Sequence, residues 1–86
     1  MKVKVGQQYK FIKEQEHIHK HGIIEIASVY NNISYCYRAH IIKGSKEIMS
    51  TQKIIRLRIM FPEGNFGFLK HQIEREAILI NNDWDE

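Results

Sequence analysis

The side chains best suited to binding chemistry in this sequence are three arginines, Arg38, Arg56 and Arg58. A guanidinium group presents paired N–H donors that hold a phosphate or a carboxylate at two points, which a lysine cannot do. We therefore predict that these arginines form the polar contacts of a binding site. The alternative is that they only keep a strand face soluble and pair with Glu25 or Glu47.

Aromatic residues could complete such a site. Tyr35 and Tyr37 come shortly before Arg38 in the sequence, and Tyr30 lies a few residues earlier. A phenol ring beside a guanidinium group can stack on a nucleobase, a pairing that single-strand binders use. Trp84, among the acids at the C-terminus, either folds back onto the protein or anchors a partner. The predicted binding residues therefore include Tyr35, Tyr37 and Trp84.

Three histidines, His17, His19 and His21, occupy alternate positions, and imidazole is a common ligand for zinc, copper or nickel. In an extended segment all three would face the same side, but spaced roughly 6.6 Å apart. A metal needs its nitrogen ligands at about 2.0–2.1 Å, so only a bent loop could bring them together. We predict a solvated, histidine-rich loop and no metal, with the three histidines kept as the candidate ligands.

Cys36 and His40 are a nucleophile and a base by residue type, but a strand would hold them roughly 13 Å apart. We predict that Cys36 is a small packing residue.

The sequence contains no glycine-rich phosphate loop, nucleophile elbow or metalloprotease helix, so we expect no enzyme, no catalytic residue and no cofactor. One cysteine cannot form an internal disulfide, which favours a reducing cytoplasm.

The charge of the 86-residue chain is distributed unevenly. The net charge is +3, but Asp83, Asp85 and Glu86 hold three of the ten acids, so residues 1–82 carry 13 basic and seven acidic residues, or +6. We divide the chain into a single domain, residues 1–82, and an acidic tail, residues 83–86. A basic domain raises the expectation of a nucleic-acid or phosphate partner. No apolar run reaches the roughly 18 residues of a membrane span, so no membrane is expected as a partner.

Four strands are predicted: alternating apolar and polar residues indicate those at residues 8–13 and 54–61, and β-branched and aromatic content indicates those at residues 23–30 and 33–42. Asn31 and Asn32 predict a tight hairpin turn between the second and third strands, and residues 14–22 and 43–52 read as polar connections. In the fourth strand Arg56 and Arg58 would share one face, because side chains alternate across a strand. That face would be basic and the opposite one part of the core.

Residues 62–65, with Pro62 and Gly64, predict a turn. A short helix is expected over residues 68–76 and a fifth strand over residues 77–80. This order predicts a mainly β protein, a small SH3-like five-stranded antiparallel barrel with one short helix before the last strand. The alternative is an open antiparallel sheet with one helix packed across it.

Three segments resemble small SH3-like barrel proteins encoded by bacteriophages and prophages: Val5-Gly6-Gln7-Gln8-Tyr9, the Asn31-Asn32 pair and residues 73–80. The resemblance covers most of the chain, without a diagnostic motif. It implies an accessory protein, cytoplasmic in a bacterial host cell, that acts by stoichiometric binding.

We therefore expect a non-enzymatic protein that binds a host protein or a protein–nucleic-acid complex, for example as an anti-CRISPR or other anti-defence inhibitor. The alternative is a small barrel that binds nucleic acid or a nucleotide through a basic face flanked by tyrosines. Either form is expected as a monomer or a small homo-oligomer.

Overall fold

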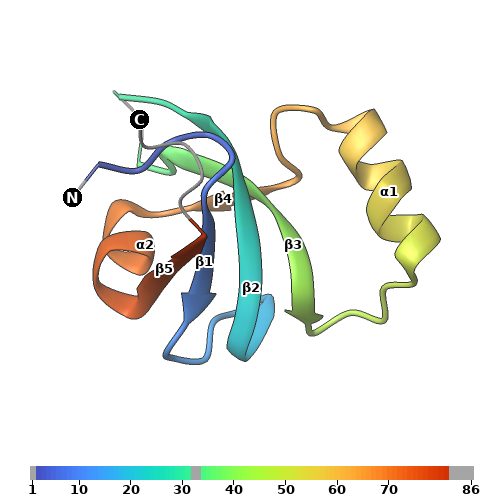
Figure 1. Cartoon of the computed structure of the whole chain (residues 1–86), viewed down its shortest axis with the longest axis horizontal. Coiled ribbons are helices and arrows are strands. Elements are labelled where there is room, and N and C mark those ends of the chain that lie inside the picture. The colour runs from blue at the N-terminus through green and yellow to red at the C-terminus, as the bar shows by residue number, and fades with distance from the viewer. Residues whose placement is uncertain (1, 32–33, 82–86) are drawn as a thin grey trace.

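The structure, a computed structural model, describes residues 2–31 and 34–81, which form five strands and two helices (Figure 1). In chain order these are β1 (Gln8–Phe11), β2 (Ile18–Val29), β3 (Tyr37–Ser45), α1 (Thr51–Met60), β4 (Phe66–Phe68), α2 (Lys70–Glu76) and β5 (Ala77–Asn81). The strands form one antiparallel sheet in the order β4-β3-β2-β1-β5. Within the described residues β4 and β5 do not pair, so the sheet is open. The mainly β, five-stranded antiparallel architecture is confirmed.

The hydrophobic core lies on one face of this sheet and is covered in part by α2. Alternate side chains of neighbouring strands point into it, because side chains alternate across a strand. Burying each large apolar side chain contributes roughly 1.5–3 kcal/mol, so this layer supplies most of the stability. The largest fully buried side chains are Tyr9, Phe11, Ile18, Ile24, Ile26, Ile41 and Ile73. Cys36 belongs to the same core, as its predicted packing role requires.

The long β2 contains an irregularity that two glycines permit. Its register against β3 shifts between Ile18 and Ile23. A Cβ on Gly22 would lie 2.3 Å from Cγ1 of Ile18, and one on Gly44, whose φ is +82°, would lie 2.7 Å from Cα of Gly22. The two backbones therefore approach as only glycines allow. The polar segment 14–22, predicted as a connection, thus supplies the first residues of β2.

The predicted fourth strand, residues 54–61, is wrong: residues 54–60 lie in α1 and Phe61 caps its C-terminal end. Ser50 caps the helix, its hydroxyl accepting a 3.1 Å hydrogen bond from the Lys53 backbone N–H. The helix also contains lysine, arginine and methionine side chains, which lose little freedom in a helix, alongside three β-branched isoleucines, which lose more. The helix ends just before Pro62, and Arg56 and Arg58 do not lie on a strand.

Other boundaries also differ from the prediction. β2 ends at Val29 and β3 begins at Tyr37, so a two-residue hairpin turn and a third strand starting at residue 33 are wrong. Asn32 and Ile33 lie outside the described residues. The turn at residues 62–65 and the fifth strand are confirmed, and the helix predicted over residues 68–76 is confirmed as the shorter α2. The short β4 was not predicted.

Helix α1 lies beside β3, at the opposite end of the molecule from α2 (Figure 1). It faces the outer side of the sheet, since its ion-pair partner Glu25 sits between Ile24 and Ile26, which point into the core. None of residues 51–60, all of which the structure describes, is buried. The helix is thus an appendage to the sheet and adds nothing to the core.

Candidate functional site

The predicted arginines occupy two separate regions, with Arg56 and Arg58 on α1 and Arg38 on β3. The Arg58 Nη2 atom lies 2.7 Å from a Glu25 carboxylate oxygen, and the other oxygen of Glu25 accepts a 3.2 Å hydrogen bond from the Gln8 side-chain amide. Arg58 therefore connects α1 to the sheet. This agrees with the alternative prediction that an arginine pairs with Glu25. Arg56 is exposed.

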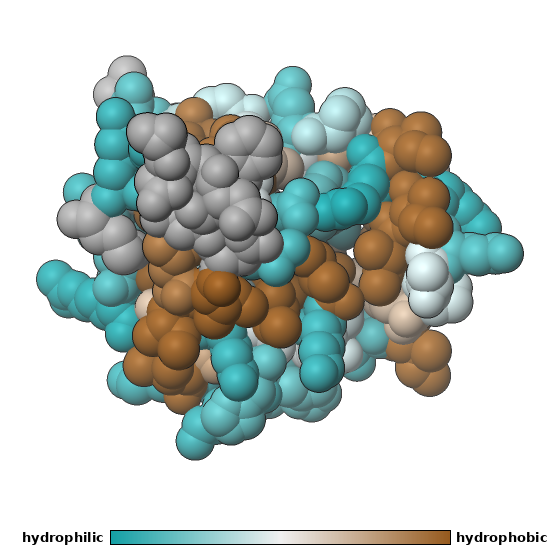
Figure 2. All heavy atoms as spheres, in the orientation of Figure 1, coloured by the Kyte–Doolittle hydropathy of each residue, from teal (hydrophilic) through white to brown (hydrophobic). Residues whose placement is uncertain are grey.

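The solvent-facing side of α1 combines apolar and basic side chains. Ile55, Ile59 and Met60 are 53%, 75% and 59% exposed. Ile55 and Ile59 are four residues apart, so they are neighbours on one helix face, with Lys53 and Arg56 also exposed on the helix. Figure 2 shows the corresponding apolar surface over α1. We refer to Lys53, Ile55, Arg56, Ile59 and Met60 as the α1 face.

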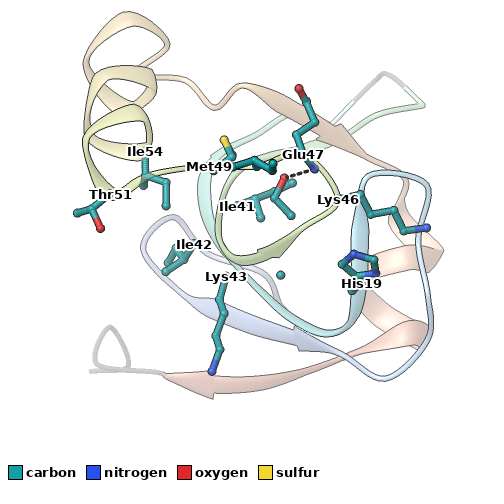
Figure 3. Close-up of a pocket in the computed structure, with 12 residues that line it drawn as sticks. His19, Ile41, Ile42, Lys43, Lys46, Glu47, Met49, Thr51 and Ile54 are labelled. Atoms are coloured by element: carbon teal, nitrogen blue, oxygen red, sulfur yellow. Dashed lines mark hydrogen bonds between the residues drawn. The ribbon is translucent and has the colours of Figure 1, made fainter.

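A groove of about 610 Å³ separates the start of α1 from the end of β3. Ile42, Met49 and Ile54 contribute apolar side chains to its lining (Figure 3). Lys43 and Lys46 contribute basic ones. The groove explains how α1 can lie against β3 without burying any of its own residues.

Arg38 borders a second depression, of about 460 Å³, beside β4. Its Nε and Nη2 atoms donate hydrogen bonds of 3.2 and 2.9 Å to the carbonyl oxygen of Gly64. Gly64 has a φ of +103°, and a Cβ there would lie 2.7 Å from the Ala39 backbone nitrogen. The turn at Gly64 can therefore approach β3 closely enough to hold the guanidinium group only because it lacks a side chain.

Aromatic side chains gather in the same depression, which we call the Arg38 depression. Tyr35 is 55% exposed. A Cβ on Gly67 would lie 3.2–3.4 Å from atoms of Tyr35, so the tyrosine packs directly against the β4 backbone. The rings of Phe66 and His17 contact each other with centroids 5.6 Å apart. The full lining is His17, Tyr30, Tyr35, Arg38, Asn65, Phe66 and Gly67. The structure thus brings Arg38 and Tyr35 together as the sequence predicts.

Tyr37 lies apart from this surface because its side chain points into the protein. It is 7% exposed, and its hydroxyl donates a 2.9 Å hydrogen bond to Glu74 Oε2 on α2. Burial, followed by the hydrogen bond to the Glu74 carboxylate and the charge of that carboxylate, raises the pKa of Tyr37 well above its ordinary value. Tyr37 therefore has a structural role, because its hydroxyl connects β3 of the sheet to helix α2.

The three candidate metal ligands do not converge. His17 contacts Phe66, His19 lies 3.2 Å from Glu14, and His21 adopts a left-handed φ of 72° at the irregularity of β2. In the part of the chain that the structure describes, no three His, Cys, Asp or Glu side chains could hold a metal ion.

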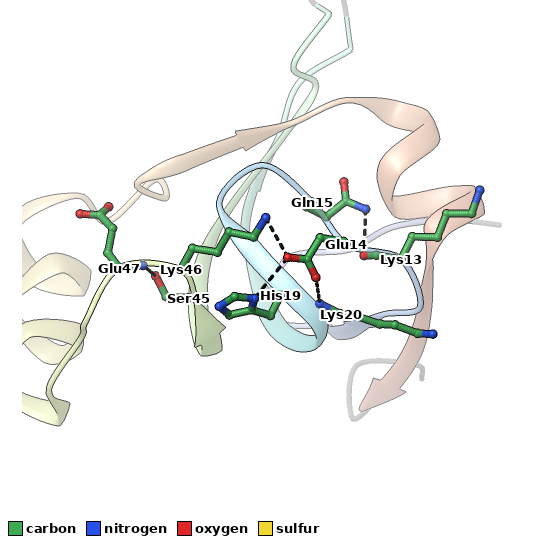
Figure 4. Close-up of polar contacts among 8 residues, drawn as sticks. All are labelled: Lys13, Glu14, Gln15, His19, Lys20, Ser45, Lys46 and Glu47. Carbon is green, nitrogen blue, oxygen red and sulfur yellow. Dashed lines mark hydrogen bonds and ion pairs between the residues drawn. The ribbon is translucent and has the colours of Figure 1, made fainter.

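His19 belongs instead to a polar cluster around Glu14 (Figure 4). The Glu14 carboxylate accepts hydrogen bonds from the Lys46 ammonium at 2.8 Å and the Lys20 backbone N–H at 2.9 Å. Chiefly the Lys46 contact, then the Lys20 N–H, lowers the pKa of Glu14 to about 2, with a smaller contribution from His19. This cluster joins the loop after β1 to the segment after β3.

Sequence reasoning missed the exposed Ile55, Ile59 and Met60 because it assigned Ile55 and Ile59 to a buried strand face. Ser50 ahead of the segment and Pro62 behind it were the available signs of a helix. Phe66 in the Arg38 depression was also missed, since it lies far from Arg38 in sequence. Trp84 lies outside the described residues.

Comparison of the chain with models of protein families, with curated proteins and with solved structures finds no match. Neither helix of the described residues has the length and apolar character needed to cross a membrane.

Proposed function

We propose that this protein acts by stoichiometric binding of a partner protein and not by catalysis, with the α1 face as its recognition surface. The observation that carries this proposal is the exposure of Ile55, Ile59 and Met60 on a helix without buried residues. Apolar area removed from water contributes about 25 cal/mol per Å², so these side chains favour a protein contact over solvent. An apolar helix face placed in a groove is an established mode of recognition.

The charge of α1 indicates which partner would fit. Residues 51–60 contain Lys53, Arg56 and Arg58 and no acid, and Glu25 neutralises only Arg58. A partner that matches this face presents an apolar groove bordered by carboxylates, because complementary charge raises the association rate and excludes wrong partners.

The resemblance to small phage and prophage proteins extends the proposal to the partner's source. A short helix directly before the last of five strands supports an SH3-like order of elements, whereas the open sheet adds no support for a closed barrel. On this basis the partner is a bacterial host protein or a protein–nucleic-acid complex in the cytoplasm, such as a component of a defence system that the protein inhibits.

The experiment compares wild-type protein with the double variant Ile55→Lys, Ile59→Lys. Proteins captured by the wild type from a bacterial lysate are identified and purified, and each is titrated against both forms by calorimetry. We expect one-to-one binding that weakens at least tenfold, or about 1.4 kcal/mol, in the variant. Equal affinity of the two forms for every captured protein would refute α1 as the recognition surface.

A second candidate function, binding of single-stranded nucleic acid, is favoured by one observation. The Arg38 depression places the half-exposed ring of Tyr35 beside a guanidinium group and Phe66. A base stacked on an aromatic side chain is stabilised by about 1–3 kcal/mol.

This candidate is tested by titrating short oligonucleotides at low and moderate salt. Nucleic-acid binding would fall steeply with salt because counterions are released, and it would weaken further with Tyr35→Ala. Lys53→Ala combined with Arg56→Ala is the control for nonspecific charge. No binding at low salt would leave only the protein-partner proposal.

A further inference from the structure

Arg38 is half-buried and carries a charge that no carboxylate of the described residues neutralises. None of the ion pairs among residues 2–31 and 34–81 includes it. The acid of the adjacent turn, Glu63, instead accepts a 2.8 Å hydrogen bond from the Tyr30 hydroxyl. A cation withdrawn from water is costly without a counter-charge, so this position favours the binding of an anion.

The contact with Gly64 fixes the orientation of the Arg38 guanidinium group. Nε and Nη2 donate to the Gly64 carbonyl oxygen, which is a neutral acceptor and does not offset the charge. Nη1 donates to no acceptor within the described residues, so the edge formed by Nη1 and the second N–H of Nη2 is unused. Two parallel N–H groups of this kind hold two oxygens of a phosphate. Arg38 is therefore preorganised to bind an oxyanion.

Aromatic and neutral polar side chains form the rest of the Arg38 depression. Tyr35 is 55% exposed and Phe66 is partly buried, so both present ring surface on which a planar base can stack. The Asn65 side-chain oxygen lies 2.9 Å from His40 Nδ1, whereas its amide nitrogen has no partner among the described residues. That nitrogen is a donor for the edge of a base.

The charge of this lining limits how much of a nucleic acid it can hold. Proteins that bind single strands line a groove with several cations, which follow successive phosphates. Among the described residues that line the Arg38 depression, Arg38 is the only lysine or arginine. Its volume of about 460 Å³ falls within the range of small-molecule sites, roughly 300–1,000 Å³. The depression therefore has room and charge for one base and one phosphate.

We propose that the Arg38 depression binds a nucleoside phosphate monoester, either a free mononucleotide or the phosphorylated end of a strand. The guanidinium group binds the phosphate, and Tyr35 and Phe66 hold the base. A phosphate monoester carries a charge of about −1.5 to −2 at pH 7, more than a phosphodiester within a strand, so a single arginine binds it better. This inference rests on the second candidate function, whose site it shares and whose ligand it narrows, and it is independent of the α1 face.

The first measurement needs no variant. Isotope-labelled wild-type protein is titrated by NMR with adenosine and cytidine 5′-monophosphate, with adenosine and cytidine, and with inorganic phosphate. We expect chemical-shift changes at Tyr35, Arg38 and Gly67, and at least tenfold tighter binding of the nucleotides, or about 1.4 kcal/mol, than of nucleoside or phosphate alone. Shift changes confined to other parts of the chain, equal affinity for phosphate alone, or no binding would overturn the proposal.

Two variants separate the roles of the guanidinium group and the ring. Arg38→Gln should weaken binding of adenosine 5′-monophosphate at least tenfold and weaken inorganic phosphate as well. Tyr35→Leu, outside the Gly64 turn, should weaken the nucleotide at least tenfold and leave phosphate binding unchanged. The matched control Arg75→Gln removes an exposed arginine of α2 that forms no ion pair in the described residues, and it should bind as the wild type does. Nucleotide affinity that survives both site variants would overturn the proposal.

Pentanucleotides with a 5′-phosphate, a 3′-phosphate or no terminal phosphate distinguish the two sources of the ligand and the two proposals. Tighter binding of a phosphorylated pentanucleotide, by at least tenfold, assigns the site to strand ends, and binding of mononucleotides alone assigns it to free nucleotides. Equal affinity for the unphosphorylated pentanucleotide would overturn the inference and leave the single-strand candidate standing. No binding of any pentanucleotide or mononucleotide would reject both.

Discussion

At the scale of single residues, the structure separates side chains that a sequence pattern groups together. Arg58 is engaged by Glu25, whereas Arg56, two positions earlier, is exposed on the same helix. Tyr35 is half-exposed and Tyr37 is buried against Glu74. The candidate binding residues therefore reduce to those whose side chains reach the surface, Arg38, Tyr35 and Arg56 among them.

Glu14 provides a prediction about acid stability. Its pKa is lowered from 4.5 to about 2 in the folded protein, so its stabilising effect is complete above pH 4.5 and is lost as the pH falls towards 2. We expect Glu14→Gln to lower the urea midpoint at neutral pH, and the difference from wild type to disappear near pH 2. The midpoint is measured by circular dichroism across this range.

Glu16→Gln is the matched control, because the Glu16 carboxylate is 86% exposed and contacts only His17, at 3.8 Å, among its ion-pair contacts in the described residues. It should change the midpoint little. A constant difference between wild type and Glu14→Gln at every pH would show that the carboxylate charge is not responsible.

At the scale of elements, the sheet and α1 have different sources of stability. Each strand of the sheet places side chains in a shared core, whereas α1 depends on its cap, the Arg58–Glu25 pair and its own backbone hydrogen bonds. An isolated helix of this length is marginal in water. Helix α1 should therefore open locally while the sheet remains folded.

Ser50→Ala tests this difference. Loss of the cap should destabilise α1 by about 1 kcal/mol, because the Lys53 backbone N–H loses its acceptor. Hydrogen exchange should then become roughly fivefold faster at α1 amides and stay unchanged in β2 and β3. Thr51→Ala, at the neighbouring exposed position, is the control and should leave the exchange rates close to wild type. Equal acceleration throughout the chain would mean that α1 opens only with global unfolding.

At the scale of the whole molecule, stability depends on a single small core. A chain of this size has a total stability of roughly 5–15 kcal/mol, so the loss of one large core side chain consumes much of it. The exposed apolar residues of α1 and β5, such as Ile59 and Ile78, contribute little to that total, because they remain in contact with water. The free energy of removing these side chains from water is therefore available for contacts with other molecules.

Two isoleucine-to-alanine variants test whether stability depends on the buried core and not on the exposed residues of α1. Ile73→Ala, at a fully buried position, should lower the free energy of unfolding by about 2–5 kcal/mol. Ile59→Ala, at a 75% exposed position, should change it by less than about 0.5 kcal/mol. Urea denaturation measures both, and a large loss for Ile59→Ala in the monomer would show that α1 belongs to the cooperative core.

The sequence by itself determined the parts of the fold that follow from local patterns. Alternation at Tyr9 and Phe11 indicated a strand, Pro62 and Gly64 a turn, and residues 77–80 the last strand. Apolar and polar side chains must alternate along a strand wherever only one face is buried, so a local pattern of this kind is enough to predict a strand. The proximity of Tyr35 to Arg38 was also predictable, because the two residues are close in sequence.

Only the tertiary structure decided the state of residues 51–60 and the composition of the candidate sites. Isoleucines and arginines in this segment fit both a strand and a helix, and the choice depends on whether the sheet has a buried position for them. The structure buries none of them, so the Ser50 cap and helix propensity prevail. The Arg38 depression likewise needs β4 to pair with β3, a contact between distant segments that no local pattern specifies.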